Sequence, residues 1–183
     1  MGTEKIPSLM VRMAIPSVIA QVINILYNIV DRIYIGHISG VGAAALTGVG
    51  LTFPIITLIS AFSAFVGSGG APLASIWMGK NDKKHAEKIL GTGVFMLLCF
   101  SLILMAVFLI FQRPLLYAFG ASDATIGYAM EYLTIYLIGT VFVEIALGLN
   151  PFIIAQGRST TAMMSIVIGA VINIVLDPIF IFV

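Results

Sequence analysis

Residues 161–183 read TAMMSIVIGAVINIVLDPIFIFV, and residues 14–37 read AIPSVIAQVINILYNIVDRIYIGH. Each stretch is long enough to cross a bilayer as a helix, because about 20 apolar residues span the hydrocarbon core. Each stretch also holds one aspartate, Asp177 or Asp31. A carboxylate inside hydrocarbon is costly, and such residues usually face a bundle interior or a wet cavity on an ion or substrate path. The two stretches therefore predict a helical membrane protein with acidic groups inside its spans.

The composition of the 183 residues is that of an integral membrane protein. Hydrophobic residues make up 60% of the chain, charged residues make up 9%, and the mean hydropathy is +1.12. Soluble domains are about half apolar and a quarter charged. The net charge of +1, with its basic residues dispersed or in one short loop, gives no indication of a nucleic-acid partner. The lipid bilayer is the partner that the composition predicts.

Five apolar stretches are long enough to span, near residues 14–37, 48–78, 89–111, 126–155 and 161–183. They predict an all-α polytopic membrane protein with about five transmembrane helices. The breaks between them read GHISGVGAA, GKNDKKHAEK, QRP with GASDA, and AQGRST. The second and fourth stretches exceed what about 30 Å of hydrocarbon requires, which predicts that they are tilted or extend beyond the bilayer.

The positions of lysine and arginine predict the orientation, because basic residues accumulate in cytoplasmic segments. Those in the amino-terminal tail, the second break and the fourth break are Lys5, Arg12, Lys80, Lys83, Lys84, Lys88 and Arg158. The first break has no basic residue, and the third has only Arg113. This alternation predicts a multi-pass protein of the plasma membrane with a cytoplasmic amino terminus.

With this orientation, the first and fifth stretches both run from the cytoplasmic to the outer side. Asp31 lies 15 residues after Pro16, and Asp177 lies 16 residues after Thr161. At 1.5 Å per residue, both aspartates lie roughly 22–24 Å from the cytoplasmic ends of their helices, in the outer half of the bilayer. The sequence thus predicts two carboxylates at a common depth.

The fifth stretch also supplies an amide. Asn173 and Asp177 are four residues apart and share a helical face. Pro178 follows, and a proline in a helix leaves the carbonyl four residues earlier, here that of Ile174, without its donor. Carboxylates beside a freed carbonyl suit a small hard cation. Two carboxylates in a dry pocket also need a compensating charge, so we expect either that sodium binds between them or that one of them holds a proton.

These arguments predict a cation-coupling site made by Asp31, Asn173 and Asp177 in a cation-coupled transporter. Two plainer explanations stay open: Asp31 pairs with the adjacent Arg32, or Asp177 caps a frayed helix end. Side chains of consecutive helical residues point about 100° apart, which weakens the first explanation. No metal site is predicted beyond sodium at this position, because neither histidine has a partner at metal-ligand spacing.

Further polar side chains are candidate pathway residues. On the first stretch they recur at intervals of three or four residues and share a face with Asp31: Gln21, Asn24 and Asn28, with Tyr27 beside them. For the amides, a pathway role and hydrogen bonding between helices are equally good explanations. Glu144 lies near the middle of the fourth stretch, where a cavity role and pairing between helices are equally open.

Four ordered stretches resemble the amino-terminal part of a multidrug and toxic compound extrusion (MATE) transporter, nearest to the bacterial multidrug exporters. They read IPSVIAQVINILYNIVDRIYIGHISGVGAAALTGVGLTFPI, GSGGAPLASIWMGKNDKKHAEKILG, EYLTIYLIG and PFIIAQGRSTTAMMSIVIGAVINIVLDPIFIF. Single motifs among them are weak, whereas the ordered set covers most of the chain. The family's amino-lobe cation site is similar to an aspartate on the first helix and an asparagine and aspartate on the fifth, which match Asp31, Asn173 and Asp177.

The resemblance implies two six-helix lobes, of which this chain would supply about five helices of the first. The sixth helix and the second lobe are expected from the remainder of the same transporter. It also implies export of organic cations or drugs across a bacterial inner membrane, in antiport with Na⁺ or H⁺ and without a cofactor. The alternative is a related lipid-linked oligosaccharide flippase, which would place basic residues along its cavity. A membrane-embedded enzyme is less favoured, because the sequence offers neither a nucleophile–base pair nor a metal cluster.

Overall fold

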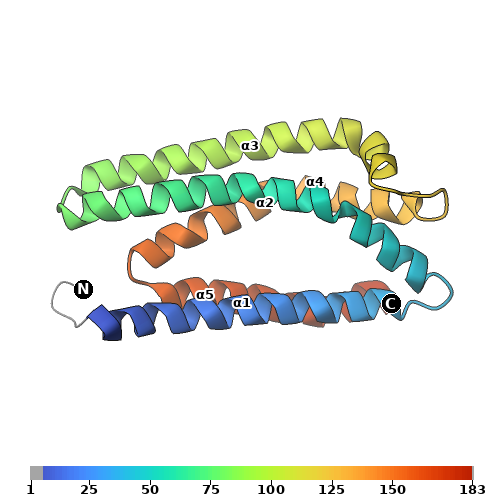
Figure 1. Cartoon of the computed structure of the whole chain (residues 1–183), viewed down its shortest axis with the longest axis horizontal. Helices are drawn as coiled ribbons and strands as arrows, with labels where there is room; N and C mark the ends of the chain where they lie inside the picture. The colour runs from blue at the N-terminus through green and yellow to red at the C-terminus, as the bar shows by residue number, and fades with distance from the viewer. Residues whose placement is uncertain (1–5, 183) are drawn as a thin grey trace. The chain divides into compact units, whose positions relative to one another are not determined.

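The computed structural model describes residues 6–182, apart from the side chains of residues 6, 9 and 180–182. Within this range it contains five helices, which are α1 (Ile6–Gly36), α2 (Gly42–Gly79), α3 (Lys83–Ala118), α4 (Ile126–Ala155) and α5 (Ser159–Phe182) (Figure 1). All five are long and apolar enough to cross a membrane. The predicted class, an all-helical polytopic membrane protein, is confirmed.

The described helices form two compact units. The first unit contains α1, α5 and the end of α4 from Ile153 onward, and the second contains residues 40–152, with α2, α3 and most of α4. In the first unit, α1 and α5 pack against each other and run in the same direction (Figure 1). Its buried side chains include Ala20 and Ala170, and small residues let two membrane helices approach closely.

The core of the second unit draws on all three of its helices. One apolar cluster contains Ile55, Ile59, Leu104, Phe108, Leu116, Ala129, Leu133 and Leu137. Their spacing of four or eight residues puts them on one face of each helix. The outward faces are apolar as well, since the side chains of Ile135 and Phe142 are 74% and 78% exposed. A helix that is apolar all round is typical of a membrane span.

The sequence predicted one break made by QRP (residues 112–114) with GASDA (residues 120–124). The chain leaves the helix at GASDA, whereas the prediction is wrong for QRP, which lies inside α3. Helix α3 continues through Pro114 to Ala118. The Gln112 Oε1 accepts a hydrogen bond of 3.1 Å from the Thr134 hydroxyl of α4, and Leu116 is fully buried in the core. These tertiary contacts hold the last turns of α3 in helical form, although proline in a helix interior is unfavourable.

Helix α3 also begins earlier than its apolar stretch, at Lys83. The carboxylate of Asp82 accepts a 3.1 Å hydrogen bond from the backbone N–H of His85 and lies 2.6 Å from the Nδ1 of the same residue. The backbone hydrogen bond from His85, and then the one from its ring, lower the pKa of the Asp82 carboxyl. An aspartate at this position satisfies a free donor of the first turn, so the helix starts at its cap and not at its first apolar residue.

Glycines set the distance between α2 and α4. A Cβ added at Gly67 would lie 2.9 Å from the carbonyl oxygen of Gly148 and 2.9 Å from the Cγ of Pro151. A backbone oxygen and a proline ring cannot rotate away, so the two helices would have to separate. By contrast, a Cβ added at Gly69 meets nothing within 4 Å.

We therefore predict that Gly67→Ala destabilises the complete transporter by about 1–3 kcal/mol, the range typical of overpacking in a tight core. Gly69→Ala, two residues along the same helix, is the matched control and should leave stability unchanged or slightly raise it. Reversible unfolding of both variants in mixed micelles measures the difference. Equal stability of the two variants would contradict the close α2–α4 contact.

Candidate cation site

The candidate site lies in the first unit, where α1 and α5 run in parallel. At one end, the Ser159 hydroxyl lies 3.5 Å from the backbone carbonyl oxygen of Arg12. Asp31 follows Arg12 by 19 residues, and Asp177 follows Ser159 by 18 residues. At 1.5 Å per residue, both aspartates lie about 27–29 Å along their helices from that contact. The parallel packing therefore brings the two carboxylates to a common level.

The Asp31 and Asp177 carboxyl groups are close enough for their charges to act on each other, and the charge of Arg32 also acts on Asp31. Both aspartate side chains are half-buried. The Oδ2 of Asp177 is buried and accepts no hydrogen bond from the residues that the structure describes. Two like charges in such surroundings repel each other unless a cation or a proton compensates one of them.

The third predicted ligand, Asn173, lies one helical turn before Asp177 and is exposed. Pro178 lies inside α5, so the carbonyl of Ile174 lacks its usual helical donor. The site thus offers carboxylate, amide and carbonyl oxygens, which are the ligands that hard cations prefer. The structure brings Asp31 and Asp177 together, whereas Asn173 is placed on the face of Asp177 by its spacing alone. The assignment of all three as cation ligands stays a prediction.

Within residues 6–182, no three or more histidine, cysteine, aspartate or glutamate side chains gather closely enough to hold a metal ion.

The candidate pathway residues of α1 keep the predicted common face. The side-chain amide of Asn28 donates hydrogen bonds to the backbone oxygen of Asn24 at 2.7 Å and to its Oδ1 at 3.0 Å. These bonds lie within α1 and not between helices. Gln21 is exposed and Tyr27 is half-buried. Their part in a pathway stays a prediction.

Glu144 lies in the second unit and is fully buried. Its polar neighbour is Ser63 of α2, but neither group makes a hydrogen bond of good geometry with the described residues. The close pair formed by Gly67 and Gly148 lies one turn along both helices and explains why Ser63 and Glu144 face each other. Sequence reasoning did not single out Ser63, because its role depends on which glycines of α2 and α4 meet.

The MatE family matches residues 16–179 of this chain. The multidrug export protein MepA of Staphylococcus haemolyticus is 28% identical over 173 residues, which are 94% of this chain and 38% of that protein. An FAD transporter of Shewanella oneidensis is 24% identical over the same shares of the two chains. This chain therefore spans well under half the length of these relatives.

Solved structures give the same result. The MATE multidrug transporter DinF-BH, solved as a complex, is similar with a TM-score of 0.90 and 35% identity, covering all of this chain and 40% of that one. An outward-facing multidrug resistance MATE family transporter of the MOP superfamily has a TM-score of 0.87 and 29% identity, covering 95% of this chain and 38% of that one. Members of this family are transporters and not enzymes. The chain belongs to the MatE family and corresponds to the amino-terminal lobe of a MATE transporter.

Proposed function

We propose that this chain forms the cation-coupling lobe of a secondary active multidrug exporter, which moves organic cations or other drugs outward in exchange for Na⁺ or H⁺. The observation that carries the proposal is the meeting of Asp31 and Asp177 from two parallel membrane-spanning helices. The names of the relatives support the substrate class, since one is a multidrug export protein and another is a multidrug transporter.

The site can couple two solutes because its charge depends on what it holds. When it is empty and ionised, Asp31 and Asp177 push α1 and α5 apart locally, and a bound sodium ion or proton removes that repulsion. Helix packing that differs between the two states would give the drug a different affinity in each of them. Such a difference is the thermodynamic requirement for coupled transport.

The flippase alternative is not favoured. A flippase would need basic side chains along its cavity. In the part of α1 that holds the cation site, the candidate for such a residue is Arg32, and its charge already acts on Asp31. The relatives described above carry the names of a multidrug exporter and an FAD transporter. For the orientation, we propose a cytoplasmic amino terminus in a bacterial inner membrane, on the distribution of lysine and arginine.

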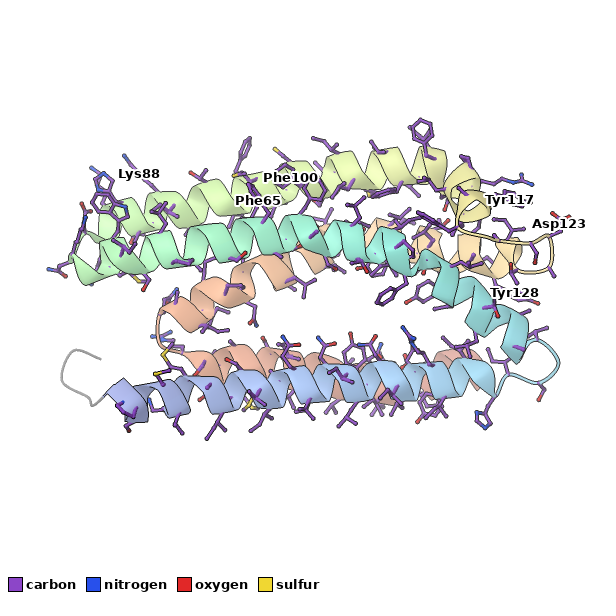
Figure 2. All side chains as sticks on the ribbon, in the orientation of Figure 1. Phe65, Lys88, Phe100, Tyr117, Asp123 and Tyr128 are labelled. Atoms are coloured by element: carbon purple, nitrogen blue, oxygen red, sulfur yellow. The ribbon has the colours of Figure 1, made fainter. Side chains whose placement is uncertain are left out.

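We predict that Asp31→Asn and Asp177→Asn each lower the rate of dye efflux by the complete transporter by about tenfold or more. An amide holds neither a proton nor the charge that attracts sodium. The measurement is dye efflux from cells with matched amounts of each variant in the membrane. The control is Asp123→Asn in the turn after α3, where asparagine can still accept the 3.1 Å hydrogen bond from the Tyr117 hydroxyl (Figure 2). If Asp31→Asn and Asp177→Asn both showed wild-type efflux, the assignment of these aspartates to a cation site would be wrong.

The coupling ion can be identified in vesicles that contain the complete transporter. We expect dye movement to follow either an imposed sodium gradient or an imposed pH gradient, and to lose that dependence in Asp177→Asn. If sodium is the ion, Asn173→Ala should raise the sodium concentration needed for half-maximal transport severalfold, since one neutral ligand contributes less than a charged one. Transport that responds to neither gradient would rule out antiport.

A further inference from the structure

A groove runs along the surface of the second unit between α2 and α3. Its volume is about 470 Å³, within the range of about 300–1,000 Å³ that is common for ligand sites. Most of its wall is apolar, with Phe65 and Leu73 from α2 and Met96 from α3. At one end, the wall is formed by Trp77 and Lys88.

The apolar surface continues beyond this groove. A second hollow of about 290 Å³ is lined by Ala61, Phe62, Phe65 and Phe100, and thus shares Phe65 with the first. Phe62 and Phe100 pack edge to face with their ring centres 5.1 Å apart. From Trp77 to Ala61 the two hollows follow 16 residues of α2, or about 24 Å. The hydrocarbon core is about 30 Å thick, so one leaflet contributes about 15 Å, and the two hollows together are longer than one leaflet.

The end of the groove at Trp77 and Lys88 is positively charged. Figure 2 shows Lys88 near the start of α3, with Phe65 and Phe100 farther along the two helices. Residues 80–88 contain four lysines and only two carboxylates. One of these carboxylates, Asp82, already accepts hydrogen bonds from His85. Lys88 directly precedes the apolar stretch of α3, residues 89–111, so it lies at the boundary of the part of the helix that hydrocarbon can cover.

Aromatic stacking orders this charged end. The rings of Trp77 and His85 stack with their centres 4.5 Å apart, and the Nζ of Lys80 lies 4.7 Å from the centre of the Trp77 ring. Tryptophan is enriched at the membrane–water interface, where its ring meets both apolar and polar groups. The groove therefore has its polar groups at the depth of the headgroups and its apolar wall at the depth of the acyl chains.

The floor of the groove is made by glycines. A Cβ at Gly69 would extend into open space, with nothing within 4 Å. At the neighbouring Gly70, and at Gly93 of α3, a Cβ would instead meet the ring of Phe152. Phe152 is almost fully buried, so a fixed aromatic ring supports the floor from below. The open face at Gly69 gives a position where the groove can be filled without moving another side chain.

From this arrangement we infer that the groove between α2 and α3 is a binding site for an anionic phospholipid, with the phosphate at Lys88 and an acyl chain along Phe65. The inference concerns the second unit and does not rest on the proposed function. Organic cations fit the groove poorly, because the lysines at its polar end would repel them. An anionic headgroup gains about fivefold in affinity for each nearby basic side chain.

Fluorescence quenching of Trp77 tests the site in the complete transporter. The two probes are phosphatidylglycerol and phosphatidylcholine that carry the same brominated acyl chains. Trp77 is the single tryptophan of these 183 residues. Subtraction of the fluorescence of the Trp77→Phe variant removes the contribution of any tryptophan in the rest of the transporter. We expect phosphatidylglycerol to quench this signal with at least about fivefold higher apparent affinity than phosphatidylcholine.

Three variants locate the binding. Lys88→Gln should lower the apparent affinity for phosphatidylglycerol about fivefold, and lower that for phosphatidylcholine less, because the choline ammonium already compensates the phosphate of phosphatidylcholine. Gly69→Leu, which fills the groove, should lower quenching by both lipids. Gly91→Leu is its matched control on α3, because a Cβ there also meets nothing within 4 Å and Gly91 does not line the groove. Unfolding temperatures without added lipid check that all three variants fold like the wild type.

Several outcomes would overturn the inference. Equal quenching by the two lipids would exclude recognition of the anionic headgroup, and competition by inorganic phosphate at the same concentration would indicate a site for free phosphate. Protection of Trp77 from both lipids would indicate that another part of the transporter covers the groove. If Gly69→Leu does not fold, Lys88→Gln decides the test. Loss of selectivity for phosphatidylglycerol in this variant supports the proposed site, and unchanged selectivity contradicts the proposed site.

Discussion

The repulsion between two carboxylates in membrane-spanning helices is the constraint on which the rest of this lobe depends. Asp31 and Asp177 reach a common level because α1 and α5 run in parallel and are in register from the contact between Ser159 and Arg12 onward. Neither carboxylate would be tolerated easily on a lone helix in lipid, since an ionised group in hydrocarbon is expensive. In the proposed function, one small cation or a proton neutralises the charge of this pair, and the two carboxylates thereby sense that ion.

In the second unit the constraint is packing and not charge, because three apolar helices have to be held in one arrangement. The glycine contact between Gly67 and Gly148 lets α2 and α4 approach until backbone meets backbone. In membranes, close van der Waals packing replaces the hydrophobic effect as the main force between helices, so small residues at such contacts carry much of the specificity. The buried Glu144 lies one turn from this contact.

Much of this fold could be predicted from the sequence, because spanning helices obey strong length and polarity rules. The presence of five apolar helices and the shared level of Asp31 and Asp177 both follow from residue counting. The prediction failed at Pro114, where contacts of Gln112 and Leu116 override the local signal for a break. The helices extend beyond the apolar stretches, because apolar runs mark the part of a helix inside hydrocarbon and not its cap. Spacing indicated which residues share a helical face, but it could not indicate which faces of α2 and α4 meet, so Ser63 was not predicted to be the neighbour of Glu144.

Two groups of charged residues in this chain occupy different positions along the helices. Asp31 and Asp177 lie within α1 and α5, while the lysines of residues 80–88 lie in the turn between α2 and α3 and in the first turns of α3. A lysine at headgroup level keeps its hydration and can bind anionic lipid at little cost, whereas a carboxylate in hydrocarbon responds strongly to a single cation. Changes in lipid charge should therefore act on the α2–α3 turn, and changes in cation concentration on the α1–α5 pair. Because the two sets of residues belong to different units, substitutions in one set leave the residues of the other in place.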